Sequence, residues 1–191
     1  MTGGSSGGYG ALHLGSKFPH IFGTVAAMAP DSFFSMSLLP EILSVKPFFD
    51  RLGGIKNIRQ EIRAGKFLRR REAHQLLNVI CMGHCYAPDG KRGFLWPIDK
   101  KGLVVGSVWK KWERHDPLKF FHKRMARIKM LFNIYLDVGD CDQYHLQYGC
   151  RQLHEILKKN KIVHSYCEFP GNHFDIGERR AYVWKWLNEI W

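Results

Sequence analysis

The stretch Gly4-Ser5-Ser6-Gly7-Gly8, close to the start of the chain, decides how the fold is interpreted. An apolar stripe at helical spacing follows it and is closed by Pro19; its members are Ala11, Leu12, Gly15 and Phe18. Residues 22–29 then form a short apolar run bounded by Pro30, which predicts a strand buried on both faces. The order of turn, helix and buried strand favours an α/β fold.

The same stretch fits the pattern Gly-x-Ser-x-Gly with Ser6 at its centre. In such a motif a sharp strand-to-helix turn holds the serine in a strained backbone conformation and exposes its hydroxyl above the sheet. Ser6 is therefore the candidate nucleophile. The backbone N–H of Gly7, at the start of the helix, would face a developing oxyanion. Glycine and serine cluster in many loops, so a glycine-rich turn without chemistry is the alternative.

The C-terminal part of the chain predicts two further strand–helix pairs. Residues 131–138 and 163–169 have the composition of strands, and residues 146–157 carry a helical apolar stripe between them. A closing helix follows, lined by Val183, Leu187, Ile190 and Trp191. Alternating strands and helices indicate a parallel sheet.

Each of these two strands runs into a polar loop. Asp140 and Asp142 follow the first strand, and His173 follows the second after a Pro-Gly turn. The carboxyl ends of parallel strands meet at one edge of a sheet, so these side chains are expected to lie close together. A serine nucleophile needs a base and an orienting acid, which His173 and Asp142 would supply. Asp140 is the alternative acid.

The middle of the chain, residues 38–129, is helical in pattern and rich in basic and aromatic residues. We expect it to be an insertion or cap on a single α/β domain that comprises residues 1–191. Proline and glycine are expected to break its helices, at Pro40, Pro47, Gly53-Gly54, Pro88, Pro97 and Pro117. Aromatic residues within this region and just before it would cover the site or simply form core; they are Phe33, Phe34, Phe48, Phe49, Trp96, Trp109 and Trp112.

The 29 Lys and Arg against 17 Asp and Glu give a net charge of +12. Most of it lies in two stretches: Lys56, Arg59, Arg63, Lys66, Arg69, Arg70 and Arg71, and then Lys110, Lys111, Arg114, Lys119, Lys123, Arg124, Arg127 and Lys129. Such charge attracts nucleic acid or anionic lipid. No zinc-finger, RNA-recognition or helix-turn-helix signature accompanies it, so no specific nucleic acid is expected and a solvated helical face is the favoured interpretation.

Composition excludes several other classes. At 45% hydrophobic and 24% charged residues the chain is globular rather than disordered or fibrous. Its apolar runs are shorter than the ~18 residues that span a bilayer. The five cysteines, at 81, 85, 141, 150 and 167, lack the spacing of a metal site and are expected to be buried free thiols. They favour a reducing, cytoplasmic location; any signal peptide would belong to a segment before Met1.

In several separate blocks the sequence resembles the esterase D-like branch of the α/β-hydrolases, which includes feruloyl-type esterases, S-formylglutathione hydrolases and acyltransferases. The blocks that carry the resemblance are residues 3–12, Phe18-Pro19, Phe22-Gly23, 29–32, 115–117, 134–139 and 168–173. The resemblance implies Ser6 as nucleophile, Asp142 in a Gly-x-x-Asp block as acid, and His173 in a Pro-Gly-x-His block as base.

The resemblance further implies a serine carboxylester hydrolase that forms an acyl-enzyme on small-molecule esters and needs neither cofactor nor metal. Family members carry several strands before the serine turn, whereas here only five residues precede Ser6, so the chain would correspond to the C-terminal part of such an enzyme. Two rivals stay open. One is a catalytically incompetent relative that acts as a basic binding protein, and the other is a protein that binds an acidic polymer or membrane surface.

Overall fold

The computed structural model describes all 191 residues and divides the chain into two compact units. Unit 1 comprises Met1–Ser37 and Asp116–Trp191, and unit 2 comprises Leu38–His115. The expected insertion ran to residue 129, but the structure places residues 116–129 in unit 1 instead.

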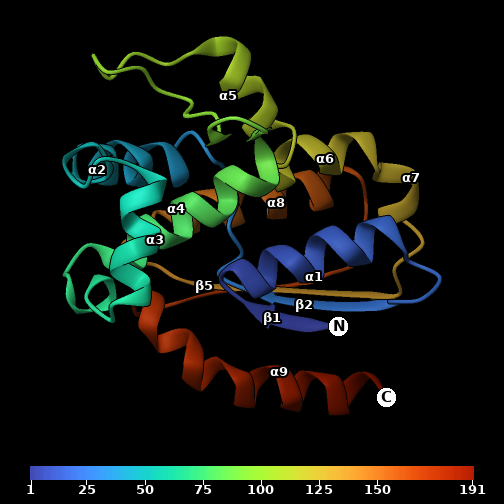
Figure 1. Ribbon diagram of the computed structural model, residues 1–191. Coiled ribbons are helices and arrows are strands. Elements are labelled where there is room, and N and C mark those ends of the chain that lie inside the picture. Colours follow the sequence, from blue (N-terminus) through green and yellow to red (C-terminus); the bar gives the residue numbers. More distant parts are fainter. The chain divides into compact units, whose positions relative to one another are not determined.

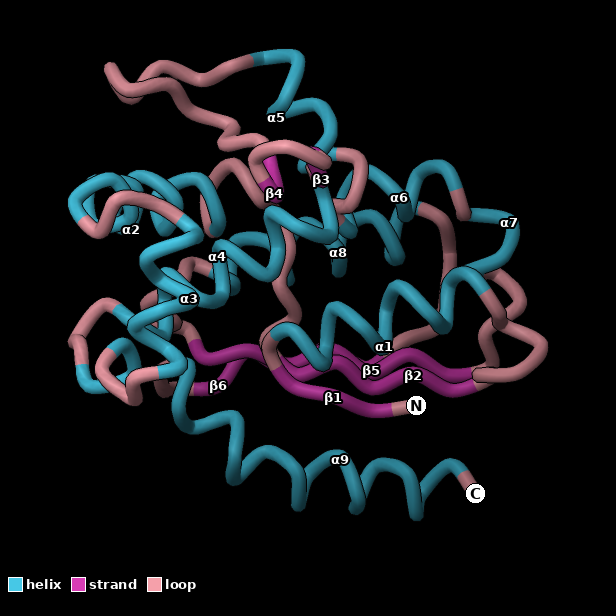
Figure 2. Tube along the Cα trace, in the orientation of Figure 1, coloured by secondary structure: helices cyan, strands magenta, loops and turns pink.

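Unit 1 is built on a parallel sheet of four strands, seen in magenta in Figure 2. The strands are β1 (Thr2–Gly4), β2 (Thr24–Met28), β5 (Asn133–Gly139) and β6 (Ser165–Phe169), in the spatial order β1-β2-β5-β6. In the register Met28 pairs with Gly4 on one side and Asp137 on the other. The predicted α/β fold with a parallel sheet is confirmed.

Helices cover both faces of this sheet (Figure 1). On one face α1 (Ser6–Lys17) and α8 (Leu146–Lys159) bury Val25 and Ala27, and on the other α9 (Ile176–Ile190) buries Ala26 and Met28. The alternation follows from the two-residue period of a strand, and because both faces are covered β2 is apolar from Val25 to Met28. No helix is long and apolar enough to cross a membrane.

Two short helices explain where unit 2 ends. In α6 (Pro117–Lys123) and α7 (Met125–Ile128) the apolar side chains of Phe120, Phe121 and Ile128 are buried in the same core as Ala11 and Leu12 of α1. Burying three large side chains there removes much apolar area from water. This packing draws residues 117–128 into unit 1.

Unit 2 is mainly helical, with α2 (Leu38–Arg51), α3 (Ile55–Arg63), a 3₁₀ turn η1 (Phe67–Arg69), α4 (Ala73–Tyr86) and α5 (Gly106–Glu113). A small hairpin pairs β3 (Pro88–Asp89) with β4 (Gly93–Phe94). Pro40 and Pro47 were expected to break a helix, yet both lie within α2. Gly53 and Gly54 do separate two helices, since their φ angles of 77° and 89° suit glycine.

Burial differs from expectation at the cysteines and at the C-terminus. All five thiols are free, but only Cys150 is buried, whereas Cys81, Cys85 and Cys141 are exposed. Trp191 was expected to line the closing helix against the core and is 92% exposed instead. In α9 it is Val183 that packs on the sheet.

Candidate active site

Ser5 occupies the sharp turn between β1 and α1. Its backbone angles, φ 56° and ψ −127°, lie in a region that non-glycine residues rarely adopt and that costs roughly 1–3 kcal/mol. Two backbone hydrogen bonds hold it there: the Ser5 N–H donates to the Met28 carbonyl at 2.8 Å, and the Tyr9 N–H donates to the Ser5 carbonyl at 3.0 Å. Strain of this kind is typical of functional sites.

The turn brings the backbones of β1 and α1 into contact at Gly3 and Gly7. A Cβ atom on Gly3 would lie 2.3 Å from the Gly7 carbonyl oxygen, so a side chain at position 3 has no room. These two glycines flank Ser5 in a Gly-x-Ser-x-Gly pattern that covers residues 3–7, one residue before the pattern that centres on Ser6. Both registers exist in the sequence, and the contact identifies the earlier one as the turn.

Ser5, His173 and Asp142 form a hydrogen-bonded chain. His173 Nδ1 lies 2.7 Å from Asp142 Oδ2, and His173 Nε2 lies 3.0 Å from Ser5 Oγ. A carboxylate only accepts, so the fitting tautomer carries its proton on Nδ1 and leaves Nε2 to accept from the serine hydroxyl. This is the geometry of a nucleophile with its base and orienting acid.

The base and the acid are both buried and are held by neighbouring groups. Asp142 is 1% and His173 8% exposed. The Tyr144 N–H donates to Asp142 Oδ1 at 2.8 Å, and the His173 N–H donates to Gln143 Oε1 at 3.0 Å. The Tyr144 ring meets the imidazole edge-on, with ring centroids 4.7 Å apart. Residues 142–144 thus fix the orientation of the imidazole.

Close packing of two loops brings the acid to the base. A Cβ atom on Gly139, at the end of β5, would lie 2.5 Å from the Gly171 carbonyl oxygen. Asp140 Oδ1 accepts the Gly171 N–H at 3.0 Å, and this bond lowers the pKa of the Asp140 carboxyl. Asp140 therefore clasps the loop that carries His173, and of the two candidate acids only Asp142 contacts the imidazole.

Ser6, the predicted nucleophile, does not contact His173. Its hydroxyl donates to Asp31 Oδ2 at 2.7 Å, so the prediction that Ser6 lies against the base is wrong by one residue. Asp31 is 7% exposed. Burial raises the pKa of its carboxyl, and the Ser6 hydrogen bond opposes that rise.

The loop that carries Asp31 is anchored by Asp116. The Asp116 carboxylate accepts the N–H groups of Phe33 at 3.0 Å and Phe34 at 2.7 Å, and at the start of α6 it also accepts the Leu118 N–H at 2.9 Å. One buried carboxylate therefore ties residues 33–34 to a helix more than 80 positions along the chain. The sequence signal for this residue was only its place before Pro117.

The first turn of α1 supplies N–H groups beside Ser5. The first N–H groups of a helix have no acceptor within it and attract negative charge. The residue that follows Ser5 in the turn is Ser6, so in this register the Ser6 N–H, rather than that of Gly7, is the candidate oxyanion donor. Gly7 lies one residue further along the same turn. No group of three or more His, Cys, Asp or Glu side chains is placed to hold a metal ion.

Two solved structures resemble the chain. One is an S-formylglutathione hydrolase from Staphylococcus aureus, with 14% identity and a TM-score of 0.48 over 96% of this chain and 52% of that one. The other is the capsule O-acetyltransferase of Neisseria meningitidis serogroup A, with 16% identity and a TM-score of 0.49 over 96% of this chain and 54% of that one. The chain spans about half the length of each.

No curated protein sequence matches the chain. A protein-family model matches residues 1–183, from the serine turn through Asp142 and His173 into α9. The model describes the family named Putative esterase, and the chain belongs to this family.

Proposed function

We propose that the protein is a serine carboxylester hydrolase in which Ser5 is the nucleophile, His173 the base and Asp142 the orienting acid. The observation that carries the proposal is the pair of hydrogen bonds from one imidazole, 3.0 Å to Ser5 Oγ and 2.7 Å to Asp142 Oδ2. Membership of the esterase family supports the same reaction class.

In the proposed reaction His173 Nε2 takes the proton of the Ser5 hydroxyl as its oxygen attacks the ester carbonyl. The new C–O bond converts the carbonyl into a tetrahedral oxyanion, and collapse of this intermediate expels the alcohol, which receives its proton from the imidazolium. Water, deprotonated by the same imidazole, then hydrolyses the Ser5 acyl ester and releases the acid. The small-molecule ester binds above Ser5.

Two groups stabilise the charges that develop in this reaction: Asp142 stabilises the imidazolium, and the Ser6 N–H stabilises the oxyanion. Asp142 stabilises the imidazolium that forms in each step, while the Tyr144 N–H keeps the carboxylate in place. The Ser6 N–H donates to the oxyanion. A preorganised donor of this kind is worth about 10²–10³ in rate, and the Asp31 contact holds Ser6 in position.

Neighbouring serines provide a matched test. With p-nitrophenyl acetate or butyrate as substrate, Ser5→Ala is expected to lower kcat by about 10⁴-fold or more, because the nucleophile is lost. Ser6→Ala removes only the hydroxyl that meets Asp31 and keeps the N–H, so its kcat should stay within about tenfold of the parent. Equal rates for the parent chain and Ser5→Ala would overturn the proposal.

A covalent probe makes the same test independent of turnover. A fluorophosphonate should attach to Ser5, and mass spectrometry of the N-terminal peptide distinguishes Ser5 from Ser6. Labelling should disappear in Ser5→Ala and in His173→Ala but persist in Ser6→Ala. A chain that is neither labelled nor active would instead match the rival interpretation, a catalytically incompetent relative.

A further inference from the structure

Unit 2 holds most of the positive charge of the molecule. Its 78 residues contain 16 Lys and Arg against seven Asp and Glu, a net charge of +9, whereas the rest of the chain has +3. A charge of this size on a small unit raises the local concentration of anions. Five of the cations gather around one hollow of unit 2.

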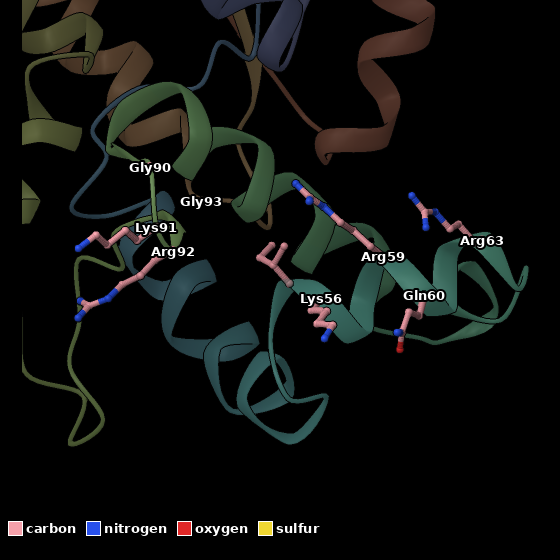
Figure 3. Close-up of a pocket in the computed structure, with 9 residues that line it drawn as sticks. Lys56, Arg59, Gln60, Arg63, Gly90, Lys91, Arg92 and Gly93 are labelled. Carbon is pink, nitrogen blue, oxygen red and sulfur yellow. The ribbon is translucent and has the colours of Figure 1, made fainter.

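This hollow has a volume of about 510 Å³ and lies between α3 and the tip of the β3–β4 hairpin. We call it the basic pocket. Five of the nine residues that line it are cationic: Lys56, Arg59 and Arg63 lie along α3, and Lys91 and Arg92 lie on the hairpin tip (Figure 3). Gln60 adds an amide, and no carboxylate lines the pocket.

None of the five cations has an ion-pair partner. Lys46 pairs with Asp50 and Arg70 pairs with Glu61 in unit 2, and neither pair involves the basic pocket. Glu61, the acidic residue of α3, is occupied by two hydrogen bonds from the Arg70 guanidinium. Figure 3 shows the five cationic side chains extended from the backbone. They are therefore available to a ligand.

The backbone on the hairpin side of the pocket is held in place. Asp89 Oδ1 accepts the N–H groups of Lys91 at 3.1 Å and Arg92 at 2.7 Å, which closes the turn. The hairpin also packs on α4, because Phe94 lies against Gly83 and a Cβ atom on Gly93 would meet the His84 ring at 2.8 Å. Asp89 uses its carboxylate to shape the tip and so leaves the two cations unneutralised.

From these features we infer that the basic pocket binds a small anion that carries two or more phosphate groups. Five unpaired cations exceed what one phosphate dianion neutralises, and Arg binds phosphate oxygens through its forked N–H groups. A hollow of about 510 Å³ has the size of a small-molecule site rather than of a groove that follows a nucleic-acid strand. This inference is independent of the proposed esterase activity.

Calorimetric titration of the purified full chain with inorganic tripolyphosphate tests the inference. Orthophosphate should bind at least about tenfold more weakly, since it engages fewer cations. The variant Arg59→Gln/Arg92→Gln removes one cation from each side of the pocket and should weaken tripolyphosphate binding by about tenfold or more. The matched control Lys110→Gln/Lys111→Gln loses the same charge on α5, outside the pocket, and should change binding by less than about twofold.

Two further arms identify the source of the phosphate groups. Vesicles of phosphatidylcholine with a few per cent phosphatidylinositol bisphosphate test a lipid headgroup; vesicle binding that tripolyphosphate displaces and the pocket variant loses supports a lipid-borne source. If only free tripolyphosphate binds, with the same variant sensitivity, the source is a soluble compound.

Three results would overturn the inference: no tripolyphosphate binding at low salt, equal weakening by the pocket and control variants, or binding of a 20-nucleotide RNA in the absence of tripolyphosphate binding. Thermal melts of the variants show whether they are folded. Arg63→Gln, a single exposed change, offers a second pocket variant in case the double variant is unstable.

Discussion

The two units of the molecule differ in the burial of their polar side chains and in whether those side chains have partners. In unit 1 three carboxylates are buried and each has specific partners: Asp142 meets His173, Asp31 meets Ser6, and Asp116 meets three backbone N–H groups. In unit 2 the cations of the basic pocket are exposed and have no ion-pair partner.

We interpret this difference as a division between the proposed hydrolysis in unit 1 and the proposed anion binding in unit 2. A buried polar group that lacks its partner costs free energy, so a buried network has one arrangement, and that is what a reaction with defined proton transfers needs. Exposed cations keep their hydration and many rotamers, so they gain a fixed arrangement only when an anion arrives. Unit 1 should therefore respond steeply to single substitutions, whereas unit 2 should respond to ligand charge.

The largest expected effect is that of Asp142→Asn on ester hydrolysis. An amide at this position can donate to His173 Nδ1 and so favours the wrong tautomer, which should lower kcat by about 10³–10⁴-fold. Asp140→Asn, two residues earlier on the same loop, is the control and should lose less than about tenfold, because Asp140 contacts Gly171 and not the imidazole. Steady-state kinetics on a p-nitrophenyl ester measure both.

Tripolyphosphate binding in unit 2 should be unaffected by Asp142→Asn. If kcat of Asp142→Asn stays within tenfold of the parent, the buried network of unit 1 is not the reacting one, and the contrast between the units no longer separates chemistry from binding.

The next effect is on stability. Asp116→Ala removes a helix cap and leaves the buried Phe34 N–H without its acceptor, so the free energy of unfolding should fall by about 2–4 kcal/mol. Urea denaturation followed by circular dichroism measures it. Asp116→Asn keeps one acceptor oxygen and should lose less. A loss below about 0.5 kcal/mol for the alanine variant would show that the loop at residues 33–34 does not depend on this anchor.

The sequence predicted that Asp142 and His173 meet, but it placed Ser6 rather than Ser5 against the imidazole. Asp142 and His173 follow strands, and parallel strands end at a common edge, so their meeting follows from topology. Ser5 and Ser6 both stand in a Gly-x-Ser-x-Gly pattern, and it is the structure that separates them, through the Ser5 backbone angles, the contact of Gly3 with Gly7 and the contact of His173 with Ser5. A sequence pattern carries no backbone angle, which is why the register was lost.

Burial of single polar residues was also beyond the sequence. Asp31 lies in a Pro-Asp-Ser stretch that is typical of turns, and its contact with Ser6 joins positions 25 residues apart. Phe120 and Phe121 indicate core, but nothing in their spacing says which of two cores they enter. The end of unit 2 was therefore placed at residue 129 instead of His115.

The smallest expected effect concerns the ionised form of the Asp31 carboxyl, which burial disfavours. Because burial raises its folded-state pKa, Asp31 contributes stability that is fully present below its unfolded pKa and is lost as pH rises through the folded value. Asp31→Asn cannot ionise and lacks this loss. The difference in unfolding free energy, variant minus parent, should therefore move in favour of the variant between acidic and neutral pH.

Asp140→Asn provides the opposite sign. The pKa of Asp140 is lowered by the Gly171 N–H, so its contribution is present above the unfolded pKa and is lost as pH falls. Urea denaturation at a series of pH values should thus give slopes of opposite direction for the two variants, with that of exposed Asp140 the slighter. If the Asp31→Asn difference does not change with pH, the Asp31 carboxylate has a stabilising partner besides Ser6, and the buried network of unit 1 extends further than the Ser6 contact.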